Sequence, residues 1–117
     1  MSEKQIVHSL EHNMIELTGL DVPVLLECLM YSIERVREAP GTPYKVRQEN
    51  LQRLFDAQEK LRKSTGVDIQ VLLECLHYSI QRVRDAQGTP YNVRQENLQR
   101  LFDVQEKLRQ MEKELPR

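Results

Sequence analysis

Residues 24–36 read VLLECLMYSIERV, and residues 71–83 read VLLECLHYSIQRV. The apolar residues in each stretch recur every three to four positions, which is the period of one face of an α-helix. Both stretches belong to a longer duplication, in which residues 18–63 align without a gap with residues 65–110. Of the 46 aligned pairs, 36 are identical, so we expect the two units to have the same fold. The sequence is compatible with either a natural or an engineered duplication.

Each unit is predicted to be a hairpin of two helices. In the first unit, Asp21 is suited to cap the start of the first helix, and a capping box with Thr18 as the cap is the alternative. The connection at residues 39–44 reads APGTPY, in which Gly41 suits the left-handed residue that ends a helix, and Pro43 suits the start of the next. The second unit repeats this pattern from Asp68 onward. Short connections of this kind favour antiparallel neighbouring helices.

Residues 2–17 have no counterpart in the repeat. Ile6, Leu10, Met14 and Leu17 are spaced three or four positions apart, which is typical of one helix face. This segment is therefore predicted to be an N-terminal helix that caps the apolar face of the repeats.

The resulting fold class is all-α, with one domain over residues 1–117. The tandem hairpins, residues 18–64 and 65–111, are predicted to form an up-down four-helix bundle with the additional N-terminal helix, and residues 112–117 to form a tail. The alternative is a short α-solenoid, because the 47-residue offset is close to the period of HEAT and armadillo repeats. The sequence patterns of those repeats are not present, so no family is assigned.

The composition argues against several classes of partner. The formal net charge is −1, from 17 basic and 18 acidic residues, and the basic residues alternate with acids. A nucleic-acid-binding surface would have the basic residues concentrated on one face. No apolar run approaches the ~20 residues of a membrane span, and the first residues do not resemble a signal peptide. The sequence has two cysteines, which we expect to be free thiols in the core. We therefore expect a cytoplasmic protein without a membrane partner.

Four residues are candidate metal ligands. Glu74 and His77 form the Glu-x-x-His pattern that di-iron bundles use, but the first unit has Met30 where the second has His77. A Met and a His from facing helices can also ligate haem iron. His8 and His12 stand four positions apart, a spacing that can chelate zinc. A complete ligand set cannot be assembled from these residues, so we expect no cofactor.

Two rows of polar side chains are candidates for an interaction surface. Within each row the residues are four positions apart and so share a helix face. The rows are Glu27, Tyr31 and Arg35 in the first unit, and Glu74, Tyr78 and Arg82 in the second. Such a row could line a polar groove, or each tyrosine could have a purely structural role.

The predicted function is a non-enzymatic scaffold or protein–protein interaction module. The sequence has no nucleophile–base set, and its four glycines do not form a phosphate-binding loop. The partner is expected to be another protein or a second copy of the chain, because the duplication suggests a self-associating hairpin linked in tandem. A metal- or haem-binding bundle is the alternative, and nucleic-acid binding is a third and weaker one.

Overall fold

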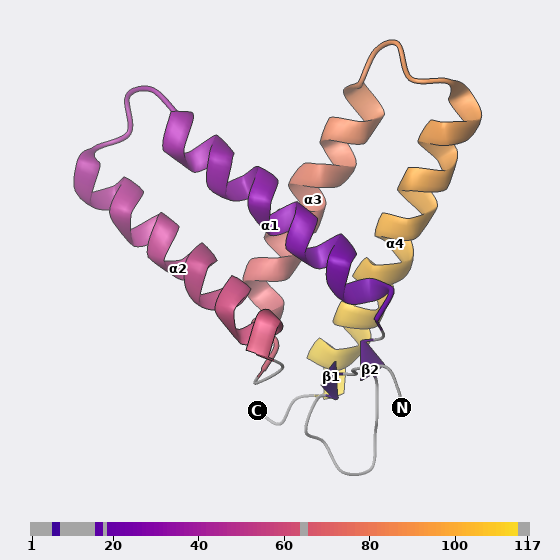
Figure 1. The fold of residues 1–117 in the computed structure, drawn as a ribbon, viewed down its shortest axis with the longest axis horizontal. Helices are drawn as coiled ribbons and strands as arrows, with labels where there is room; N and C mark the ends of the chain where they lie inside the picture. The colour runs from indigo at the N-terminus through magenta and orange to yellow at the C-terminus, as the bar shows by residue number, and fades with distance from the viewer. Residues whose placement is uncertain (1–5, 8–15, 18, 64–65, 115–117) are drawn as a thin grey trace.

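The computed structural model describes residues 6–7, 16–17, 19–63 and 66–114. Its helices are α1 (Asp21–Glu38), α2 (Tyr44–Lys63), α3 (Ile69–Asp85) and α4 (Tyr91–Glu114), and two short strands, β1 (Ile6–Val7) and β2 (Glu16–Leu17), precede them. The helices run alternately up and down (Figure 1). The predicted all-α fold is confirmed.

The four helices form two hairpins that cross each other. Hairpin 1 consists of α1 and α2, and hairpin 2 consists of α3 and α4. In Figure 1 the hairpins form a V, with α1 crossing in front of α3 and the two loops at the open end. α1 and α3 pack against each other at the centre, while α2 and α4 lie outside them. The arrangement is a compact bundle, not a row of repeats stacked in one direction.

The two loops are built alike. Gly41 and Gly88 have φ values of 79° and 86°, in the left-handed region that glycine adopts without strain. Arg47 donates a side-chain hydrogen bond to the carbonyl oxygen of Ala39 at 2.5 Å, and Arg94 does the same to Ala86 at 2.6 Å. These bonds satisfy a backbone carbonyl at the end of α1 and of α3, which helix geometry leaves unpaired. The predicted hairpin connections are confirmed.

The start of α1 differs from the prediction. Asp21 is the first helical residue and not the cap. Leu20 holds the cap position without a side-chain capping bond, and Thr18, the alternative cap, lies outside the described residues. The carboxylate of Asp21 accepts a hydrogen bond from Lys107 Nζ on α4 at 2.6 Å. This charge-assisted bond joins the start of α1 to α4 of the other hairpin. Asp68 is at the cap position of α3, also without a side-chain capping bond.

The predicted N-terminal helix over residues 2–17 is wrong. β1 and β2 pair as antiparallel strands, with Ile6 opposite Leu17 and Val7 opposite Glu16, so a continuous helix cannot connect them. β-branched residues such as Ile6 and Val7 favour strands, and an isolated short helix is marginal in water. Leu17 is nevertheless fully buried in the core, as the capping role required.

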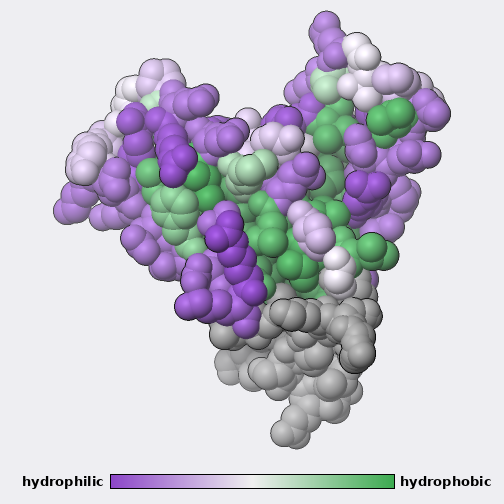
Figure 2. Space-filling model, in the orientation of Figure 1, coloured by the Kyte–Doolittle hydropathy of each residue, from purple (hydrophilic) through white to green (hydrophobic). Residues whose placement is uncertain are grey.

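The core is aliphatic and draws on every helix. Its largest fully buried side chains are Leu17, Leu25, Leu29, Leu61, Leu72, Leu76, Val104, Leu108 and Met111. Figure 2 shows hydrophobic side chains gathered where the hairpins cross and hydrophilic ones along the outer edges of the arms. Among the described helices, none has the length and apolar character needed to cross a membrane.

Candidate functional site

The interface between α1 and α3 is reciprocal. The guanidinium of Arg35 on α1 lies over the ring of Tyr78 on α3, 4.3 Å from its centroid. The equivalent residues of the other unit repeat the contact, with Arg82 over Tyr31 at 3.8 Å. The arginine of each unit thus contacts the tyrosine of the other unit, which is the pattern of a twofold-symmetric interface. We call these four residues the reciprocal interface.

The two cysteines occupy equivalent positions of α1 and α3, and both are buried. Both are free thiols. Burial raises the pKa of the Cys28 thiol to about 11, and the hydroxyl of Ser79 on α3 opposes the rise. Burial likewise raises the pKa of the Cys75 thiol, and Ser32 on α1 opposes it. At neutral pH both thiols are protonated and poorly nucleophilic, so they serve as small core residues.

The two predicted polar rows lie on α1 and α3, but their side chains contact residues of the other unit. Tyr31 and Tyr78 each meet an arginine of the other unit, so neither row forms a groove by itself. Glu74 also reaches outside its row, to Arg53 on α2, with Nη2 and Oε1 3.7 Å apart. Each Arg–Tyr contact contributes about 0.5–1 kcal/mol at such a partly exposed position. The structural interpretation of the tyrosines is thereby favoured.

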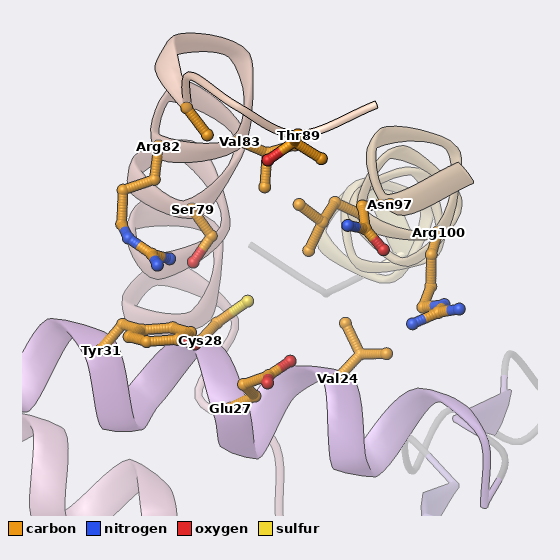
Figure 3. Close-up of a pocket in the computed structure, with 12 residues that line it drawn as sticks. Val24, Glu27, Cys28, Tyr31, Ser79, Arg82, Val83, Thr89, Asn97 and Arg100 are labelled. Atoms are coloured by element: carbon orange, nitrogen blue, oxygen red, sulfur yellow. The ribbon is translucent and has the colours of Figure 1, made fainter. Parts of the chain in front are cut away.

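A cavity of about 350 Å³ opens between α1, α3 and α4 (Figure 3). We call it the α4-side cavity. Its residues are Val24, Glu27, Cys28 and Tyr31 from α1, Ser79, Arg82 and Val83 from α3, Ala86 and Thr89 from the loop, and Asn97, Arg100 and Leu101 from α4. In Figure 3 the carboxylate of Glu27 points into the space between Arg82 on one side and Arg100 on the other. Its size falls at the lower end of the range for small-molecule sites.

A second, more open cavity of about 550 Å³ lies over the reciprocal interface. It is lined by α1 and α3 with the residue that follows α1, and it contains both stacked arginines. Glu34 and Glu38 of α1 add acidic groups at its edge. One face of each tyrosine ring in this cavity is covered by a guanidinium group.

The outer helices expose the same large side chains in both hairpins. Tyr44 of α2 is 76% exposed and Tyr91 of α4 is 75% exposed. Val46 and Phe55 of α2, and their equivalents Val93 and Phe102 of α4, are also exposed. Arg37 and Arg84 each lie near the phenylalanine of their own hairpin, at 5.7 and 5.6 Å. The protein therefore presents one surface pattern twice.

The candidate metal ligands are not brought together in the described part of the chain. Glu74 is paired with Arg53, and the exposed His77 lies with its Nε2 3.3 Å from Nε2 of Gln81. Met30, at the position equivalent to His77, is itself exposed on α1. Residues 19–63 and 66–114 hold no group of three His, Cys, Asp or Glu side chains placed to bind a metal. His8 and His12 lie outside the described residues.

Sequence reasoning missed most of the α4-side cavity. Ser79, Asn97 and Arg100 belong to two different helices and show no distinctive spacing. The one usable signal was the duplication itself, because a self-pairing hairpin must bring residues of one unit against those of the other.

Comparison with known proteins gives no relative: no family model, curated protein or solved structure matches this chain.

Proposed function

We propose that this protein is a non-enzymatic interaction module in which two helical hairpins form a covalently linked, pseudo-symmetric dimer. The reciprocal interface is the observation that carries the proposal. Arg35 over Tyr78 and Arg82 over Tyr31 are the paired contacts that two separate copies of one hairpin would make in a twofold dimer. The symmetric pairing covers the apolar faces of α1 and α3 and leaves α2 and α4 on the outside.

The outer helices supply two copies of one docking surface. Tyr44 and Tyr91 contribute little to the core because three quarters of each side chain is exposed. Exposed aromatic residues are enriched at protein–protein interfaces, where they act as anchors. A partner that docks on α2 would find an equivalent site on α4, so the module is bivalent. The partner is a helical segment of another protein or a second copy of this chain. We place the module in the cytoplasm, since its two cysteines are free thiols.

Native mass spectrometry of the full chain, purified gently from cells that express it, tests this proposal. We expect assemblies that contain two partner molecules per chain, or several copies of the chain. The variant Tyr44→Ser/Tyr91→Ser should lose these assemblies and keep the melting temperature of the wild type, because neither ring is in the core. Each single variant should retain one of the two sites.

Glu49→Gln/Glu96→Gln is the matched control, since both glutamates are exposed on the same two helices. Glu49 and Glu96 lie more than a third of a turn around the helix from the tyrosines, so the control substitutions should leave the assemblies intact. A bare single chain in every preparation would overturn the proposal. So would assemblies that survive the loss of both tyrosines but dissociate in the control.

A further inference from the structure

The α4-side cavity has an equivalent location in the other half of the bundle, and the two locations differ in their charged groups. Arg53 of α2 and Glu74 of α3 form an ion pair at 3.7 Å. Their equivalents are Arg100 of α4 and Glu27 of α1, which line the α4-side cavity and form no ion pair with each other within 4 Å. We call Arg53 and Glu74, which are in contact, the closed pair. Arg100 and Glu27, which are separated at the cavity, are the open pair.

Ser79 provides a second and independent observation. Its side chain is only 3% exposed, and its Oγ makes no hydrogen bond of standard geometry in the described structure. Figure 3 shows this oxygen directed into the cavity, beside the sulfur of Cys28. This hydroxyl acts on the Cys28 thiol, which is a weak hydrogen-bonding group, so an oxygen or nitrogen atom of a ligand in the cavity would be a stronger partner for it.

The arrangement of charges defines the ligand. Arg100 and Asn97 lie on α4 and together offer donors for a carboxylate. Glu27 on α1 offers acceptors for an ammonium group. Across the cavity, Ser79 and Arg82 on α3 offer donors for a further oxygen atom. Val24, Val83 and Leu101 provide apolar surface between these groups.

We propose that the α4-side cavity binds a free α-amino acid whose side chain ends in a carboxamide or carboxylate. The main-chain carboxylate pairs with Arg100 and Asn97, the ammonium group pairs with Glu27, and the side-chain oxygen accepts hydrogen bonds from Ser79 and Arg82. The volume of about 350 Å³ is large enough for a molecule of this size. Because all three charged residues are exposed to solvent, solvent screening weakens their ion pairs with a ligand. This inference does not rest on the docking surfaces of α2 and α4.

NMR chemical-shift titration of the full chain with L-glutamine and L-glutamate tests the site, with L-leucine, acetate and methylammonium as comparison probes. We expect the largest shifts at amides around Glu27, Ser79 and Arg100. L-Glutamine or L-glutamate should bind about tenfold more tightly than L-leucine, which cannot hydrogen-bond Ser79. Acetate and methylammonium should each bind more weakly still, because each satisfies only one end of the site.

The duplication supplies a matched control for every variant. Arg100→Gln and Glu27→Gln should each weaken binding about tenfold, whereas Arg53→Gln and Glu74→Gln, their equivalents in the closed pair, should leave it unchanged. Ser79→Ala should reduce the preference for L-glutamine over L-leucine, and Ser32→Ala should not. The proposal is overturned if neither polar amino acid shifts the resonances, if acetate binds as well as they do, or if the control variants are equally impaired. None of these results depends on whether Tyr44 and Tyr91 bind a protein.

Discussion

Hairpins 1 and 2 share 36 of 46 aligned residues, yet their surroundings differ. Arg53 and Glu74 close on one side of the bundle, whereas Arg100 and Glu27 stay apart on the other. The side that contains α4 also has the Lys107–Asp21 ion pair between the hairpins. Near-identical sequences therefore do not give identical sites. A duplicated unit has two different neighbours in the chain, and the environment of each copy follows from those neighbours.

One buried substitution coincides with this difference. Val104 of α4 occupies the core position that Ala57 has in α2, and both are almost completely buried. The valine brings two more carbon atoms into the core than the alanine, and a close-packed interior must adjust to such a change. The comparison of the two hairpins can be tested by changing equivalent residues one at a time.

The largest expected effect is in the shared core. Leu25→Ala and Leu72→Ala each remove a side chain that is fully buried at equivalent positions of α1 and α3. Each should lower the free energy of unfolding by about 2–5 kcal/mol, from lost burial and the cavity left behind. Urea unfolding measures both values. A large loss for one variant and almost none for the other would show that the symmetry of the interface does not extend to its energetics.

The pH dependence of stability should sharpen the comparison at the cysteines. The Cys28 thiol has a pKa of about 11 in the folded protein, raised by burial from 9.0. Between these values the unfolded chain loses the thiol proton and the folded chain keeps it, so unfolding becomes easier as the pH rises. The stabilisation is fully present below pH 9 and is lost as the pH approaches 11, by about 2–3 kcal/mol at most.

Urea unfolding between pH 8 and pH 11, roughly the window in which thiols titrate, measures this effect. The free energy of unfolding of Cys28→Ala should fall less steeply with pH than that of the wild type. The same is expected for Cys75→Ala, because burial also raises the pKa of that thiol. Comparing variants removes the common contribution of lysines and tyrosines. A slope unchanged by either substitution would mean that the thiols ionise equally well in the folded protein.

The smallest expected effect separates the starts of α1 and α3. Asp21→Asn removes the charge that Lys107 contacts, and should cost about 1 kcal/mol because the lysine is partly exposed. Asp68→Asn should cost less, since the carboxylate of Asp68 makes no capping bond to α3. Thermal unfolding of the two variants gives the comparison. Equal losses would mean that the ion pair between the hairpins adds nothing beyond the general effect of a helix-terminal carboxylate.

Local features of the sequence predicted most of the fold. The period of the apolar residues located the four helices, and Gly41 and Gly88 located their loops, because both depend on contacts within a few residues. The N-terminal segment was predicted wrongly because the spacing of Ile6 and Leu17 also permits strand pairing. In that segment Leu17 is buried in the core from a strand and not from a helix.

The sequence by itself determined that this protein is helical, duplicated and built of two hairpins, since helix period, glycine conformation and internal identity are local or countable properties. Only the tertiary structure decided that Tyr31 meets Arg82 and not its own row, and that Glu27 and Arg100 remain apart around a cavity. These outcomes depend on how α1 crosses α3 and on where the chain connects the two copies. The physical reason is that side chains on different helices become neighbours through packing, and that packing is set by the whole core and not by the spacing of any one helix.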